Sequence, residues 1–555
     1  MHKRSECEEA SKHGGRTGRQ GLSGTMQRLR KRLGTSAWLF PLVGLLALGW
    51  FLLRVLPKPS RARYPCQRVA MPLGLGFIGW VVGLTFSALS FSRLKDFVRR
   101  RRFVAAAGAL VVGLGAAWFG LATVTDLPVT LAGSPEPFTP TEPANTPMGQ
   151  GRGIHPGRVV WAHDPKVVSW DGETGNWWDD SNLDPKRVHA ALHHSLIRLT
   201  GENTPEAAWR ALFKHFNQEK GRRDGGYADG EKIAIKVNLN TSVGYEWNQK
   251  LDNSPQMIYA LLDDLVNRAG VPESAITVLD PSRYIGVPIW ERCHADFPDV
   301  HYVDGEAARN REKAEPDRDA ALHYADPEVP DNGNIFLPKS MTEADYMINL
   351  ALLKGHTLAG VTLNAKNHFG SVWRQESVGK HRNGWDPSRM HKYVTIHDAG
   401  SIQGRKMGTY NSLVELMGHR DLDGKCMLYL IEGFYAAVHQ GGEPVRWESA
   451  PFEGRWPASL FVSQDGVAIE SVAVDFCRTE PVMKRFVNGN VDNYLHEAAQ
   501  AGDPPSGVTY DPEGDGTPLE SLGVHEHWNN ARDKQYSRNM GKDRGIELVT
   551  VRRGR

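Results

Sequence analysis

Residues 232–279 contain a strand–helix–strand pattern, which constrains the fold more than any other feature of the chain. Residues 232–239 (KIAIKVNL) predict a strand, residues 254–268 a helix opened by Ser-Pro, and residues 276–279 a second buried strand. A helix that connects parallel strands covers one face of their sheet. We therefore expect an α/β fold.

The same alternation continues along the chain. Further strands are expected at residues 158–170, 346–350 and 427–432, and helices at 185–199, 205–216, 412–418 and 467–476. This pattern predicts a mixed or mostly parallel sheet with helices on both faces. Ligands of such folds bind beyond the carboxyl ends of the strands.

The first 150 residues differ from the rest in charge. They hold 20 Lys and Arg against seven Asp and Glu, a net of +13, whereas the remainder has a net of −11. Three apolar stretches without a charge, residues 37–53, 69–91 and 103–124, interrupt this basic region. Because about 20 apolar residues span a bilayer, we expect about three transmembrane helices rather than a nucleic-acid-binding arm.

Positive charges flanking these stretches predict their orientation. Three spans with the N-terminus inside place 15 Lys and Arg inside and five outside. We therefore expect a protein of the cytoplasmic (inner) membrane, with residues 1–124 as basic tail and anchor. A Pro/Thr-rich linker is expected at 125–157, and an extracytoplasmic, periplasmic domain at 158–555.

The run Arg99-Arg-Arg-Arg102-Phe-Val-Ala before the third stretch allows two interpretations. It resembles a twin-arginine export signal, or the four arginines simply follow the positive-inside rule. Both interpretations give the same orientation.

The cysteines make an iron–sulfur cluster unlikely. The chain has five, and Cys293, Cys426 and Cys477 of the expected globular part are widely spaced without a C-x-x-C pair. Buried free thiols are the preferred interpretation, with one disulfide as the alternative.

Polar residues follow the predicted strands where ligands of α/β folds bind. The candidate ligand-binding residues are Asn238, Asn240, Ser282, Lys354, Thr357, Lys366 and Asn367. Lysine ammonium groups attract phosphate or carboxylate, and amides and hydroxyls add hydrogen bonds. The sequence therefore predicts an anionic small-molecule ligand, against the simpler alternative that these residues cap helices or face solvent.

Several motifs resemble the bacterial family called domain of unknown function 362. They are VNLN, an S-P-Q helix start, VLDPS, INLALLKGH, TLNAKNHFG, LIEGFYA and SQDGVAIESV, between about residues 230 and 480. The flanking sequences are similar to a membrane-anchored branch of that family. The resemblance implies no established reaction. The chain departs from the family pattern in KGHT, where KTH is commoner, and lacks the ferredoxin-like cysteine module of many members.

Histidines and carboxylates near the strand ends suggest acid–base or metal chemistry. We predict catalytic roles for His356, Glu432 and Asp280, and a divalent metal site at His356, His368 and Glu432. Glu432 ends an apolar strand and precedes a glycine, a natural ligand position. The alternative to a catalytic or metal-binding role, for any one of these histidines, is that it is an ordinary core or surface residue.

Three functional classes fit these observations. The first is a membrane-anchored enzyme that binds an anion, with metal-assisted transfer or hydrolysis as its reaction. The second is a non-catalytic module that binds a cell-envelope ligand or partner. The third, an electron-transfer accessory, is weakened by the missing cysteine clusters. The expected partners are a membrane and an anionic small molecule, without nucleic acid.

Overall fold

The computed structural model describes residues 142–552, except 240–243, 330–331, 374–389 and 399–402, and scattered positions between 45 and 112. The chain divides into two compact units, residues 1–137 and 138–555. In the part of the chain that is described, no helix is long and apolar enough to cross a membrane. The three predicted spans lie largely outside the described residues, so they stay predictions.

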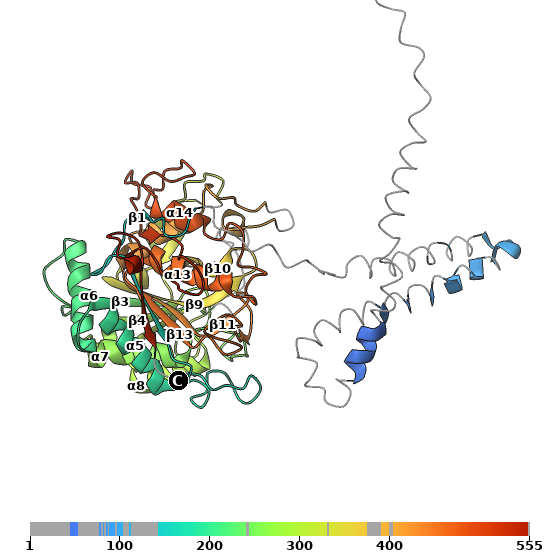
Figure 1. The fold of residues 1–555 in the computed structure, drawn as a ribbon, viewed down its shortest axis with the longest axis horizontal. Helices are drawn as coiled ribbons and strands as arrows, with labels where there is room; N and C mark the ends of the chain where they lie inside the picture. Colours follow the sequence, from blue (N-terminus) through green and yellow to red (C-terminus); the bar gives the residue numbers. More distant parts are fainter. Residues whose placement is uncertain are drawn as a thin grey trace, which may run out of the picture. The chain divides into compact units, whose positions relative to one another are not determined.

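The second unit is built on a mixed, mostly parallel sheet of 11 described strands (Figure 1). Its main path runs β15 (Glu547–Arg552), β2 (Arg158–His163), β13 (Ser459–Ser463), β11 (Cys426–Ala437), β9 (Tyr346–His356), β3 (Ile233–Lys236), β4 (Ile276–Asp280), β5 (His301–Asp304), β6 (Glu312–Lys313). β13 runs antiparallel to both neighbours, and all other neighbours on this path are parallel. The α/β prediction is confirmed.

Helices cover both faces of this sheet (Figure 1). One face carries α5 (Pro185–Thr200), α6 (Pro205–Glu219), α7 (Pro255–Asn267) and α8 (Val287–Asp296); the other carries α10 (Asn364–Asn367), α12 (Leu413–Gly418), α13 (Gly466–Thr479) and α14 (Asn493–Ala499). Strand side chains alternate between the two cores, as the β pleat requires. In β9, Ile348 and Leu350 join the α5–α8 side, whereas Met347 and Ala351 join the α13 side.

Short pairs complete the second unit. They are β1 (Met148–Gly149) with β14 (Val524–His525), β7 (Pro316–Leu322) with β8 (Ile335–Pro338), β10 (Gly360–Thr362) with β9, and β12 (Pro444–Val445) with β11; α9 is Lys339–Thr342. Single 3₁₀ turns lie at Glu273–Ala275 (η2), His368–Gly370 (η3), His391–Tyr393 (η4), Asp423–Lys425 (η5) and Arg538–Met540 (η6).

Four helices begin at capping residues that the sequence makes visible. Asp184, Thr204 and Ser254 precede proline at the first turn of α5, α6 and α7, and their side chains accept from backbone N–H groups. Asp465 caps α13 by accepting from the N–H of Ala468 (2.9 Å). The caps explain why the helix starts are predicted to within a residue.

The folded unit differs from the sequence prediction at its start. Residues 142–157 were expected to belong to a linker, yet β1 pairs with β14, and the N–H of Arg152 donates to Asp465 (2.9 Å). Strand pairing across more than 370 positions is invisible to local patterns. The cysteine prediction is confirmed, because Cys293, Cys426 and Cys477 are buried and free.

Candidate functional site

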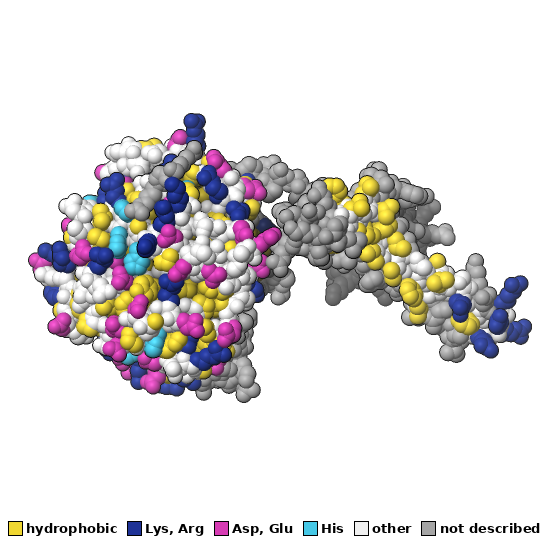
Figure 2. All heavy atoms as spheres, turned by 90° about the horizontal axis from the view of Figure 1, so that it is seen from below, with side chains coloured by type: hydrophobic (Ala, Val, Ile, Leu, Met, Phe, Trp, Pro, Cys, Tyr) yellow, Lys and Arg dark blue, Asp and Glu magenta, His cyan; other side chains and the backbone are white. Residues whose placement is uncertain are grey.

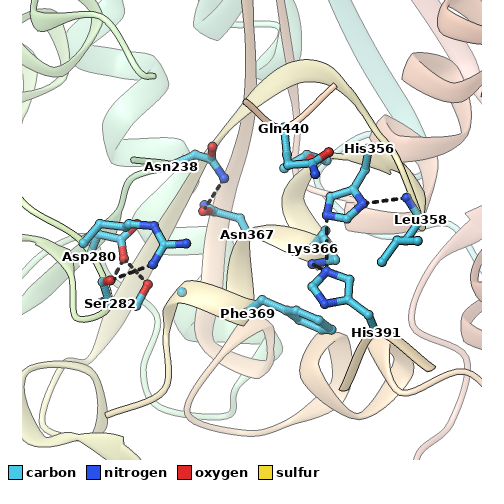
Figure 3. A pocket seen from close by; sticks show the side chains of 13 residues that line it. Asn238, Asp280, Ser282, His356, Leu358, Lys366, Asn367, Phe369, His391 and Gln440 are labelled. Carbon is cyan, nitrogen blue, oxygen red and sulfur yellow. Dashed lines mark hydrogen bonds between the residues drawn. The ribbon is translucent and has the colours of Figure 1, made fainter. Parts of the chain in front are cut away.

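A cavity of about 330 Å³ lies beyond the carboxyl ends of β3, β4 and β9 (Figure 3). Its lining residues are Asn238, Asp280, Ser282, Arg283, His356, Leu358, Thr362, Lys366, Asn367, Phe369, Gly370, His391 and Gln440. They come from the ends of β4, β9 and β10, from the loops that follow the strands, and from α10, η3 and η4. The volume suits a small molecule or the head group of a larger one.

Six residues predicted from the strand ends line this cavity: Asn238, Asp280, Ser282, His356, Lys366 and Asn367. Asn240 lies outside the described residues. The structure thus brings together most of the predicted ligand-binding set, although the chemical roles stay predictions.

Lys236 anchors the wall between β3 and α10. Its fully buried ammonium donates to Oδ2 of Asp280 (3.2 Å), Oδ1 of Asn367 (3.0 Å) and the carbonyl of Val237 (2.6 Å). Gly370 lies so close that a Cβ there would be 3.0 Å from Nζ of Lys236. Sequence reasoning missed this residue, although a lysine inside an apolar strand was a visible signal.

Asp280 has hydrogen-bond donors on both carboxylate oxygens. Oδ1 accepts from the backbone N–H (3.1 Å) and hydroxyl (2.9 Å) of Ser282, and Oδ2 accepts from Lys236 and from the N–H of Leu239 (3.3 Å). These bonds fix the loop after β4. The geometry therefore fits a positioning role better than the predicted catalytic one.

His356, His391 and Lys366 form a continuous line of nitrogen atoms along one wall (Figure 3). The N–H groups of Leu358 and Ala359 donate to Nδ1 of His356 (3.1 and 3.2 Å), so the neutral ring carries its proton on Nε2. That Nε2 is 3.3 Å from Nε2 of His391, which is 3.3 Å from Nζ of Lys366. These two contacts join the three side chains into one wall of the cavity.

Lys366 is a buried cation on an aromatic face. Its Nζ lies 3.4 Å from the centroid of the Phe369 ring, and no carboxylate in the described part of the chain forms an ion pair with it. Burial, with the nearby charge of Arg283, lowers the pKa of Lys366 well below 10.5. Burial and the charge of Lys366 likewise hold the pKa of His356 well below 6.5.

Lys354 and Thr357, two further predicted ligand residues, do not line the cavity. Nζ of Lys354 donates to the carbonyl of Leu251 (3.2 Å), and burial lowers the pKa of Lys354 to about 8. Thr357 instead holds Gln440: its N–H donates to Oε1 and its hydroxyl accepts from Nε2, both at 3.0 Å. Thr357 therefore orients a lining residue.

The structure does not bring the three predicted metal ligands together. Glu432 accepts from the N–H of Ser254 (3.1 Å) and from Asn253 (2.9 Å) on the α7 side of the sheet. Burial raises the pKa of Glu432, opposed by these hydrogen bonds. His368 lies on the α13 side, where its Nε2 is 2.7 Å from Asp423. Glu432 points from β11 to the α7 side, whereas His368 lies in η3 on the other side, so the sheet separates them.

Two other groups could hold a metal ion among the described residues. One comprises Glu142, Asp492, His496 and His525, and the other His189, His193 and Asp264. Neither includes a residue of the cavity, so both candidate groups lie at places that sequence reasoning did not select.

The face of the folded unit seen in Figure 2 does not carry one sign of charge. Figure 2 shows Lys and Arg interspersed with Asp and Glu over the visible face of the folded unit. Asp280 is the only carboxylate among the described lining residues, beside the cationic side chains of Arg283 and Lys366.

Comparison with known families identifies the segment that holds the cavity. The family model described as Domain of unknown function (DUF362) matches residues 233–475. This segment is a DUF362 domain. It runs from β3 into α13, and all lining residues of the cavity lie within it. No curated protein and no solved structure matched the chain.

Proposed function

We propose that the cavity of the DUF362 domain binds a small ligand through a phosphate or carboxylate group. One observation carries this proposal: Lys366 is buried at the cavity wall, and no described carboxylate pairs with it. A buried cation without a counter-charge is unfavourable. A bound anion would supply that counter-charge, and Arg283 would add a planar fork suited to oxyanions.

A second feature of the ligand follows from Asn238. Its side-chain Oδ1 is buried without a hydrogen-bond partner, while its Nδ2 donates to Asn367 (3.1 Å). An unsatisfied buried acceptor is costly. The proposed ligand therefore carries a hydrogen-bond donor, such as a hydroxyl, beside its anionic group.

We favour an enzyme over a binding module because of the line from His356 to Lys366. Lys366, whose pKa is lowered by burial, can accept a proton from a bound ligand, and the ring nitrogens of His391 and His356 continue the line beside it. A module that only binds needs the cations but not this line. If the protein converts its ligand, and His391→Gln abolishes the conversion but keeps the affinity for the ligand, the protein is an enzyme. If the ligand binds and is never converted, the protein is a binding module.

Calorimetric titration of the full chain tests the proposed anion site. Pyrophosphate and inorganic phosphate are expected to bind more tightly than acetate, and glycerol not at all, because the electrostatic attraction grows with ligand charge. Titrations at constant ionic strength control for screening. Equal binding of all four probes, or of none, would contradict the proposal.

We also propose that the cavity faces the outside of the cytoplasmic membrane, as the flanking charges indicate. Alkaline phosphatase fused after Arg555 is expected to be active. A fluorescent protein fused at the same position is expected to show no fluorescence, because it would be exported unfolded. The opposite pair of results would overturn this orientation.

A further inference from the structure

Three histidines and two carboxylates converge outside the DUF362 domain. Glu142 lies near the start of the folded unit, Asp492 and His496 at and within α14, and His525 and His527 in and after β14. The ligand atoms of Glu142, Asp492, His496 and His525 all lie within 4.8 Å of one another.

The spacing around Glu142 fits a common ligand sphere. Its Oε1 is 2.8 Å from Nε2 of His527, 3.0 Å from Nε2 of His496 and 3.4 Å from Nε2 of His525. Ligand atoms that each lie about 2.0–2.2 Å from a tetrahedral zinc ion are separated by about 3.3 Å. These ring nitrogens and this carboxylate need little movement to share one ion.

The protonation of His525 supports a cation at this place. The hydroxyl of Ser471 donates to the carbonyl of Val467 (2.7 Å), so its oxygen accepts from Nδ1 of His525 (2.8 Å). The remaining nitrogen, Nε2, then presents a lone pair toward Glu142. This atom is fully buried and lies 3.4 Å from Oε1 of Glu142 without the geometry of a hydrogen bond. A positive ion between these two acceptors would satisfy both.

Asp492 supplies a second unsatisfied atom. Its Oδ2 is 2.9 Å from Nη2 of Arg478 and 3.1 Å from Nε2 of His527, whereas its buried Oδ1 has no hydrogen-bond partner. His527 in turn is held through Nδ1 by Asp475 (2.6 Å). His527 thus contacts both carboxylates of the cluster through Nε2, and side chains that hold ligands in this way orient them in protein metal sites.

We infer that Glu142, Asp492, His496 and His525 form a closed structural site for one divalent transition-metal ion. Two imidazoles and two carboxylates suit zinc. The ion would link Glu142, near the start of the folded unit, to α14 and β14. It would add to the pairing of β1 with β14, which covers only two residues of each strand. β1 and α14 lie next to each other (Figure 1).

Metal analysis of the untagged full chain tests this inference. After dialysis against zinc and then against metal-free buffer, we expect one zinc ion per chain, and a Tm about 5 °C or more above that of the chelator-treated protein. Cobalt in place of zinc should give the visible absorption of a tetrahedral site. His525→Gln should weaken zinc binding about 100-fold or more.

Two variants keep the test decisive. Glu142→Gln preserves size and hydrogen bonding but removes a charged ligand, so it should also lose the ion if the site exists. His215→Gln, in α6, is the matched control and should keep it. Absence of zinc from the unchanged chain, or zinc that leaves with His193→Gln but stays in His525→Gln, would overturn the inference.

Discussion

Lys236→Met is expected to lower the free energy of unfolding by about 3–5 kcal/mol. The substitution removes the cation that Asp280 and Asn367 contact, and so leaves a buried carboxylate without its ion-pair partner. Removing one partner of a buried ion pair typically lowers the free energy of unfolding by this amount. Urea denaturation of the variant and of the unchanged protein gives the difference.

Two further variants control the Lys236 experiment. Lys232→Met removes an exposed ion pair with Glu343 from the same segment and should change stability by less than about 1 kcal/mol. Asp280→Asn combined with Lys236→Met should recover part of the loss, because the unpaired charge is gone. Equal effects of Lys232→Met and Lys236→Met would refute the anchoring role.

Lys366→Met is expected to act in the opposite way. The unliganded variant should be as stable as the unchanged protein or more stable, because a buried cation without a described carboxylate partner is replaced by an apolar side chain of similar length. Affinity for pyrophosphate should fall about 100-fold or more, because a charge-assisted contact with the anion is lost.

Denaturation curves with and without pyrophosphate measure both effects at once. The unchanged protein should gain stability from the anion by mass action, and Lys366→Met should gain almost none. A variant that is strongly destabilised but still stabilised by pyrophosphate would show that Lys366 supports the fold rather than the ligand.

The fold could be predicted because its signals are local. The alternation of strand and helix patterns and the caps Thr204 and Ser254 lie within short windows. Strand lengths could not be predicted in this way. β9 continues to His356 because β10 and β11 pair with its end, and β11 continues to Ala437 through β12 and β9.

The location of the candidate site could be predicted from the sequence, but the role of each residue in it could not. The rule for carboxyl ends of parallel strands selected Asn238, Asp280 and Lys366 correctly as neighbours of one cavity. It could not separate Lys366 from Lys354, because twist and long-range packing decide which side chain reaches the cavity. Gln440 was missed because it lies in a loop with no motif.

The predicted metal ligands are not brought together in the structure, for a related reason. His356, His368 and Glu432 all lie at or near predicted strand ends, yet the sheet separates Glu432 from His368. Glu142, His496 and His525 instead meet across more than 350 positions. No spacing rule on a single sequence connects residues so far apart.

The proton count of anion binding tests the central claim most directly. Because burial holds the pKa of Lys366 below 10.5 and a bound anion would raise it, binding should take up protons between the two pKa values. Affinity should then fall as pH rises from the pKa of the free protein to the higher pKa of the complex, and should be level above it. Calorimetry near pH 8 in two buffers of different ionisation heat measures the uptake.

We predict proton uptake by the unchanged protein and by Lys232→Met when pyrophosphate binds, and no uptake by Lys366→Met. Tight binding without proton uptake, or the same uptake in Lys366→Met, would contradict an anion site at Lys366.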